Sequence, residues 1–264
     1  MRAAALQARR ALSTFAHSSS TTTVLRNAEN GAELYLVGTA HVSRASAEEV
    51  REVMRAVKPD TVVLELCPAR AEQLMKPPSE RESTLQELLR TISAPTSLSS
   101  KLLGLSMRGF YAAWKHAGLE PGGEFRAAME EAKRLPGCRV VYGDQAATVT
   151  LRKLAASLSV AGLLRMALAP PAVPAALASV LGRGGTAEDA VERLKDRATV
   201  RLLVAFTRKL QPKATGVLLD ERDRILYEAL RAQTGRVVGV VGLAHVDGIE
   251  ALWNGTTREG ALRA

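Results

Sequence analysis

The sequence ELYLVGTAHVS, Glu33 to Ser43, has the pattern of a buried strand that stops abruptly in a turn of small residues carrying a histidine. The pattern returns two hundred residues later as RVVGVVGLAHVDGI, Arg236 to Ile249. In both places an apolar, β-branched run ends at Gly-x-x-His, and a helix is expected to follow. The chain contains only four histidines. The repetition of this motif is therefore the strongest functional indication in the sequence.

The residues around the first motif predict a βαβ unit. The β-prone run Thr21–Arg26 and a Gly-containing turn precede Leu34–Val37, which predicts a hairpin leading into a sheet. After His41, Ser46 and Glu49 have the spacing of a capping box, and apolar residues follow with helical periodicity up to Val57. Lys58-Pro59 should end that helix, and the apolar run Thr61–Leu66 is typical of a strand in a parallel sheet.

The remaining chain continues the alternation of strands and helices. Further strands are predicted at Arg139–Tyr142 and Val237–Val241, and the intervening segments are mainly helical, with two long helices expected in Thr186–Lys209 and Gly216–Thr234. We therefore predict an α/β fold with a central, mostly parallel sheet, helices on both faces and a helical insertion around residues 145–210. The expected organisation is a leader in residues 1–21, a single domain in 22–254 and a polar tail in 255–264.

The inferred strands finish in polar residues, namely His41, Glu65, Asp144 and His245. Ligands of open α/β sheets lie beyond the carboxyl ends of the strands, so these side chains are expected to converge there if the strands are parallel neighbours. Two histidines and a carboxylate can bind zinc, or non-haem iron, manganese or cobalt, and leave positions open for water or substrate. Gly38 and Gly242 would let the backbone turn sharply and approach a ligand closely.

Glu65 has an equally weighted structural interpretation. A carboxylate that ends a buried apolar run needs a partner, because a buried unpaired charge costs several kcal/mol. Arg70 should lie on the first turn of a helix opened by Cys67-Pro68. Arg222 falls on the apolar face of its predicted helix, since Leu218, Ile225, Leu226 and Ala229 lie at helical spacings from it. A buried pair of Glu65 with either arginine is thus the alternative to metal ligation.

The net charge of +9 is concentrated where it suggests targeting rather than nucleic-acid binding. Residues 1–28 hold Arg2, Arg9, Arg10 and Arg26 with many Ser and Thr and no acidic residue, which is the composition of an organelle transit peptide. No basic cluster is interleaved with aromatic residues, so no nucleic-acid partner is expected. The uncharged segment Met166–Gly182 contains three prolines, and we expect a helical hairpin or lid there rather than a membrane span.

Six stretches resemble the TraB family, which includes the PrgY proteins and is distantly related to the Tiki metalloproteases. They occur in family order: LYLVGTAHVSRAS, KPDTVVLELCPAR, PGGEFRAAMEEA, VVYGDQAATVTLRK, LLDERDRILYEAL and VVGVVGLAHVDGI. The resemblance is greatest to eukaryotic organellar members and covers about residues 22–254. It implies an EreA/ChaN-like α/β fold and, from the Tiki branch, a metal-dependent peptidase site. The positions implied are His41, His245 and Glu65, with Arg70, Asp144, Glu221 and Arg222 as further matches.

The sequence departs from the family pattern at two places. The usual Gly-Asp-Arg is Gly143-Asp144-Gln145 here, which removes a cation near the expected site. The C-terminal stretch Asn254–Ala264 is polar and carries no hydrophobic anchor. With the N-terminal composition, this favours import into mitochondria, with the plastid or the mitochondrial outer membrane as alternatives.

Three functional hypotheses follow. The first is a metal-dependent hydrolase acting on peptides or small amides or esters, with a Zn, Mn, Co or Fe ion. The second is a non-catalytic protein that binds organelle protein partners and uses the same residues as a buried polar network. The third is a haem-binding module, as in the distant ChaN relatives.

Overall fold

The computed structural model describes residues 21–41, 43–76, 121–157, 168, 172–182, 184 and 186–256. Its centre is a five-stranded sheet of order β1-β2-β5-β3-β4. The strands are β1 (Thr22–Arg26), β2 (Glu33–Thr39), β3 (Thr61–Leu64), β4 (Arg139–Tyr142) and β5 (Arg236–Gly242). Only β1 is antiparallel to its neighbour, and β2, β5, β3 and β4 are mutually parallel. The predicted hairpin and the mostly parallel sheet are both confirmed.

The two Gly-x-x-His motifs follow neighbouring strands, but they are offset by one residue. In the β2–β5 register Thr39 lies opposite Gly242, and Gly38 lies opposite Val241. His245 then lies inside the first turn of the next helix, α14 (Leu243–Trp253). His41 lies instead in a turn before α2 (Arg44–Val57). Because of this offset, the two histidines do not occupy equivalent positions beyond the strand ends.

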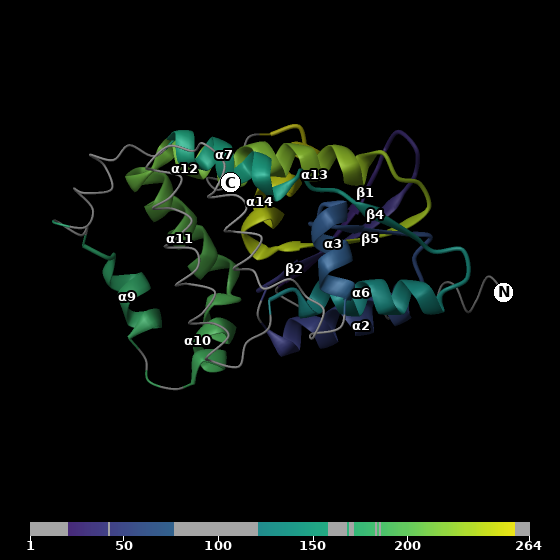
Figure 1. Cartoon of the computed structure of the whole chain (residues 1–264), viewed down its shortest axis with the longest axis horizontal. Helices are drawn as coiled ribbons and strands as arrows, with labels where there is room; N and C mark the ends of the chain where they lie inside the picture. The colour runs from purple at the N-terminus through teal and green to yellow at the C-terminus, as the bar shows by residue number, and fades with distance from the viewer. Residues whose placement is uncertain are drawn as a thin grey trace.

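Helices cover both faces of the sheet (Figure 1). On one face α2, α3 (Pro68–Met75) and α6 (Gly123–Arg134) pack through Val50, Met54 and Phe125, which are almost fully buried. On the other face α13 (Glu221–Arg231) and α14 pack through Leu226 and Ile249. Burying such side chains contributes about 1.5–3 kcal/mol each, so the two apolar layers hold the strands in place.

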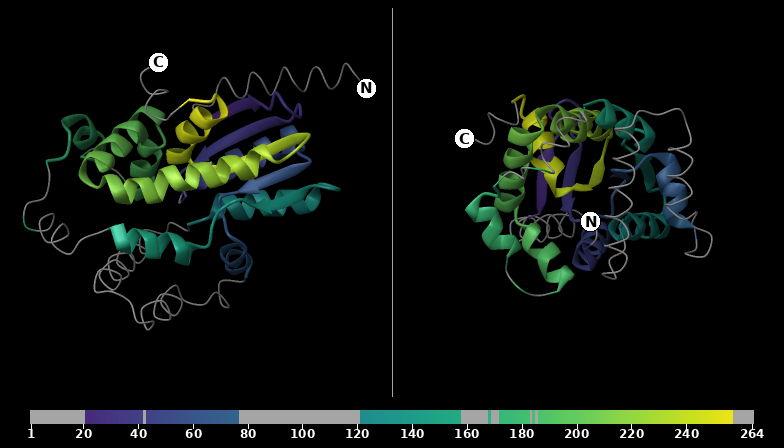
Figure 2. Two further views of the ribbon diagram at one scale, coloured as in Figure 1. Left: turned by 90° about the horizontal axis from the view of Figure 1, so that it is seen from above. Right: turned by 60° about the vertical axis from the view of Figure 1, so that its left-hand side comes forward.

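Further helices lie beyond the carboxyl ends of the parallel strands (Figures 1 and 2). They are listed in chain order as α7 (Ala147–Ser157), α9 (Ala175–Leu181), α10 (Ala187–Leu194), α11 (Arg197–Leu210) and α12 (Pro212–Thr215). A π-helical turn, η1 (Gly216–Asp220), joins α12 directly to α13. Single π-turns of this kind are frequent next to functional residues.

Several predicted boundaries differ from the structure. The run Thr61–Leu66 leaves the strand after Leu64, so Glu65 lies just beyond it. The N-cap of α2 is Ser43, whose side chain accepts a hydrogen bond from the backbone N–H of Ser46, so the predicted capping box at Ser46 is wrong. The long helix expected in Thr186–Lys209 is divided, because Asp196 caps a new helix, α11.

Some predictions fall on residues that the structure does not describe. The leader in residues 1–20, the segment 77–120 and the tail beyond residue 256 lie outside the described ranges. Residues 166, 167 and 169–171 of the segment Met166–Gly182 also lie outside them, whereas its later part contains α9. Among the helices that are described, none combines the length and the apolarity needed to cross a membrane.

Candidate functional site

Glu65 lies at the centre of the polar residues that gather beyond the strand ends. Its backbone N–H still donates to Val240 O at 3.1 Å, which continues the pairing with β5. Its carboxylate Oε2 accepts a hydrogen bond from the backbone N–H of Gly242 at 2.6 Å. The residue is only 3% exposed. The second half of the chain thus positions a buried carboxylate that comes from the first half.

Arg222 is the cation that compensates Glu65. From the start of α13, its guanidinium donates to Glu65 Oε1, and also to Asp144 Oδ2 at 2.7 Å. Its burial opposes the charged form, but the charges of Glu65 and Asp144 outweigh this and raise the pKa of Arg222 further above its ordinary value. Of the two arginines predicted as partners of Glu65, Arg222 is the one that donates to its carboxylate.

His245 contacts two carboxylates through its two ring nitrogens. Nε2 lies 3.3 Å from Glu65 Oε1, and Nδ1 lies 2.7 Å from Asp223 Oδ1. Burial alone would lower the pKa of this imidazole, but the charge of Glu65 and the hydrogen bond to Asp223 raise it to about 9. For Glu65, burial acts to raise the pKa, and the nearby His245 and Arg222 charges hold it well below its usual range. His245, Glu65 and Arg222 therefore all carry a charge near neutral pH.

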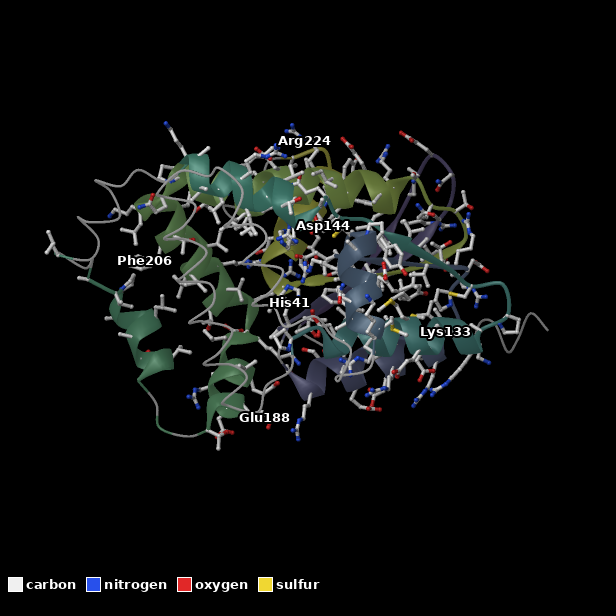
Figure 3. The ribbon with its side chains drawn as sticks, in the orientation of Figure 1. His41, Lys133, Asp144, Glu188, Phe206 and Arg224 are labelled. Carbon is white, nitrogen blue, oxygen red and sulfur yellow. The ribbon has the colours of Figure 1, made fainter. Side chains whose placement is uncertain are left out.

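His41 has the same arrangement on the more open side of the site. Its Nδ1 lies 2.8 Å from Glu124 Oε1, and its Nε2 lies 3.8 Å from Glu65 Oε1. Desolvation acts to lower the pKa of His41, but the hydrogen bond to Glu124 and the charge of Glu65 give a net increase. The side chain is 44% exposed, whereas that of His245 is 4% exposed. His41, which is labelled in Figure 3, is thus the more exposed of the two motif histidines.

Both motif glycines are required by space rather than by backbone conformation. A Cβ atom on Gly242 would lie 2.8 Å from His41 Nε2 and 3.3 Å from Glu65 Oε2. A Cβ on Gly38 would lie 2.6 Å from Leu243 Cδ1. The absence of a side chain at Gly242 makes room for the polar centre, and its absence at Gly38 lets α14 pack against β2.

Two other predicted positions lie away from this centre. Arg70 is exposed on the first turn of α3, and within the described part of the chain it has neither a hydrogen bond nor an ion pair. Its charge nevertheless acts on His41, where it opposes protonation. Glu221 points away from the centre and pairs with Lys153 of α7 at 2.5 Å, and its side chain is 40% exposed.

Glu124 and Asp223 are the site residues that sequence reasoning missed. Glu124 is fully buried near the start of α6, and Asp223 is 3% exposed near the start of α13. The signal was present for Asp223, because Leu226 and Leu230 follow it at the spacings of one buried helix face. Glu124 likewise precedes Ala127 and Ala128 at that spacing.

The fit of a metal ion can be tested on this geometry. Within the described residues, no three His, Cys, Asp or Glu side chains already form a preassembled metal site. Two ligands of a tetrahedral ion lie roughly 3.4 Å apart, given bonds of about 2.1 Å, and the observed Nε2 to Oε1 distances are 3.3 and 3.8 Å. Both Nδ1 atoms are held by carboxylates, which is the usual support of metal-binding histidines. Binding of an ion between these atoms would require loss of the proton on His245 and opening of the contact between Arg222 and Glu65 Oε1.

The carboxylate of Glu124, which holds His41 Nδ1, has one buried oxygen without a partner in the described part of the chain. Glu124 Oε2 has no hydrogen-bond partner among the described residues, although Glu124 is completely buried. A buried carboxylate oxygen in this condition is costly, and a bound ion or water is one way to satisfy it.

Comparisons with known proteins agree with the arrangement of motifs. The model of the TraB/PrgY/gumN family matches residues 24–262. The chain is 31% identical over 255 residues to a human TraB domain-containing protein, and it also matches the bovine protein of that name at 31%. An uncharacterised protein of Methanocaldococcus jannaschii is 26% identical over 231 residues.

The human match covers 86% of this chain and 64% of the relative, so the chain spans somewhat less than two thirds of that protein's length. The archaeal match covers 84% of this chain and 54% of the relative. The matched residues include both Gly-x-x-His motifs, Glu65, Asp144 and Arg222, which the fold brings together. The chain belongs to the TraB/PrgY/gumN family.

Proposed function

We propose that the protein is a metal-dependent hydrolase that cleaves peptides or related small amides or esters. The observation that carries this proposal is the convergence of two histidine Nε2 atoms on one buried carboxylate oxygen, Glu65 Oε1. Each of these histidines is held from behind by a second buried carboxylate, Glu124 or Asp223. Such an arrangement orients the free ring nitrogens toward a common point.

Each residue has a distinct task in this proposal. His41 and His245 would hold a divalent ion, and Glu65 would be its third ligand or a general base. An ion held there would polarise a substrate carbonyl and lower the pKa of bound water. Arg70, whose charge acts on His41, would stabilise the negative charge that develops on the substrate, while Arg222 pairs with Glu65 and Asp144.

Metal content of the purified full-length chain tests the proposal. We expect one Zn, Mn, Co or Fe ion per chain after dialysis, measured by plasma mass spectrometry. His41→Ala and His245→Ala should each lose it. Gly242→Ala should lose it as well, because the new Cβ would lie 2.8 Å from His41 Nε2. His116→Ala, which changes a histidine outside both motifs, is the matched control.

Hydrolysis must follow the same pattern as metal binding. We expect cleavage of a quenched fluorescent peptide library by the metal-loaded protein and none by the His245→Ala variant. Metal that stays bound in both histidine variants would contradict the proposed ligands. Wild-type protein that takes up none of these ions, even when they are added back, would contradict a metal-dependent activity.

The saturated hydrogen bonding of Glu65 favours a second function. Arg222 already donates to Oε1 and Gly242 N–H to Oε2, so each oxygen of Glu65 has a partner without an ion. The same residues would then serve as the buried polar network of a non-catalytic protein that binds organelle partners. In that case His41→Ala should lower the melting temperature while wild-type and variant protein both lack metal.

Mitochondrial import is a separate proposal that rests on the acid-free, arginine-containing composition of residues 1–28. We expect residues 1–30 fused to a fluorescent protein to label mitochondria in transfected cells. A variant fusion with Arg2, Arg9 and Arg10 changed to glutamate should not. A diffuse cytosolic signal from the unmodified fusion would contradict the proposal, and plastid labelling in plant cells would identify the alternative compartment.

A further inference from the structure

One short segment, residues 192–201 at the junction of α10 and α11, contacts two backbone segments that carry the histidines. They are the turn from His41 to Ser43 and the start of α14 from His245 to Asp247, which we term the histidine loops. Ser43 Oγ, two residues after His41, donates a hydrogen bond to Glu192 Oε1 of α10. Asp247, two residues after His245, accepts hydrogen bonds from Arg197 and Arg201 of α11. Each histidine is thus followed, at the same distance along the chain, by a residue that this segment holds.

The contact with the second loop is extensive. Arg197 Nε lies 3.0 Å and Arg201 Nε lies 2.8 Å from the Asp247 carboxylate. Arg197 also donates to Glu250, one turn further along α14. Asp247 is 13% and Arg197 is 23% exposed in their side chains, so the pair is largely shielded from water. Shielded, multiply bonded arginine–carboxylate pairs are stronger and more directional than ordinary surface pairs.

The contact with the first loop is reinforced through a neighbouring lysine. Lys195 lies 3.5 Å from Glu192 and 3.7 Å from Glu49 of α2. Glu49 in turn accepts a hydrogen bond from Thr21 Oγ1, and the Thr21 carbonyl accepts one from the backbone N–H of Gly38. Ser43 is 3% exposed and is also the N-cap of α2. The segment therefore holds the start of α2 and the strand end that precedes His41.

We infer that Glu192 and Arg197 are positioning residues that set the separation of the His41 and His245 imidazoles. The sheet hydrogen bonds fix β2 against β5 only up to Thr39 and Gly242, and the histidines lie beyond those residues. The segment 192–201 bridges the two histidine loops beyond the strand ends, where α10 and α11 lie (Figure 1). The expected effect on metal affinity rests on the proposed function, whereas the expected effect on the positions of the two imidazole rings does not.

The test compares Glu192→Ala and Arg197→Ala with a control pair elsewhere. Arg55→Ala is the control, because Arg55 donates to Glu131 at 2.7 Å and joins α2 to α6 away from the histidine loops. Ring nitrogen signals of His41 and His245 are recorded by long-range ¹⁵N–¹H correlation on metal-free, full-length protein at one pH. Zinc affinity is then measured by competition with a chromophoric chelator.

We expect the ring signals of both histidines to shift in Glu192→Ala and Arg197→Ala, and zinc affinity to fall about tenfold, as for other supporting residues of metal sites. Glu192→Gln should restore the wild-type signals, since its amide oxygen still accepts from Ser43 Oγ. Arg55→Ala should lower the melting temperature and leave signals and affinity unchanged.

Either alanine variant with unchanged ring signals would overturn the inference, whatever its melting temperature. If wild-type protein binds no zinc, the proposed function fails, and the ring signals alone still decide whether the segment positions the histidines.

Discussion

Replacing Arg222 with alanine is expected to destabilise the fold by about 3–5 kcal/mol, which is the usual cost of removing one partner from a buried ion pair. The loss would remove the cation that Glu65 and Asp144 share and leave Glu65 with the two histidines, and the two carboxylate side chains are 3% and 4% exposed. Neither carboxylate could regain hydration without opening the strand ends. The effect should exceed that of any exposed arginine in the described chain.

Urea unfolding at pH 7, followed by circular dichroism, measures this cost. Arg222→Lys should lie between wild type and alanine, because an ammonium keeps the charge but cannot donate to both carboxylates as a planar guanidinium does. Arg51→Ala is the matched control, since Arg51 pairs with the 56% exposed Glu48 and should lose less than about 1 kcal/mol. A loss for Arg222→Ala as small as that of the control would show that the pair is solvated.

The sheet and its polar end could be predicted because both depend on local patterns. Apolar β-branched runs predict β2, β3, β4 and β5, and the helix-breaking Pro59 predicts the end of α2. The parallel arrangement follows from the helices between the strands. The convergence of His41, Glu65, Asp144 and His245 then follows from the shared direction of the strands.

Helical spacing could mark Glu124 and Asp223 as buried, but it could not predict that they pair with the two histidines, because this depends on how the helices are rotated against the sheet. Glu124 lies 83 residues after His41, and no sequence spacing joins them. The offset between the two Gly-x-x-His motifs depends on the β2–β5 register, which apolar runs on both faces do not specify. The choice of Arg222 over Arg70 likewise follows from the orientation of α13, which begins in a π-turn.

The stability of the metal-free protein is expected to fall as pH rises from about 6.5 to 9. The folded pKa of His245 is raised to about 9 from 6.5. A raised folded pKa means that the stabilisation is complete below the unfolded pKa and is lost as pH rises through the folded one. The difference corresponds to about 3 kcal/mol. Glu65 has the opposite sign, because its depressed pKa makes its contribution complete above about 4.5 and lost only in more acidic solution.

Urea unfolding of chelator-treated protein at pH 6.5, 7.5, 8.5 and 9.5 tests this expectation, with His245→Gln as the matched variant. The wild-type free energy of unfolding should decline over this range, and the variant's should change much less. An equal decline in both would assign the effect to other groups. Saturating zinc should reverse the wild-type trend, because a metal ion requires the neutral imidazole and competes with its proton. A network serving only the fold would keep the same decline with zinc present, so this one titration separates the two proposed functions.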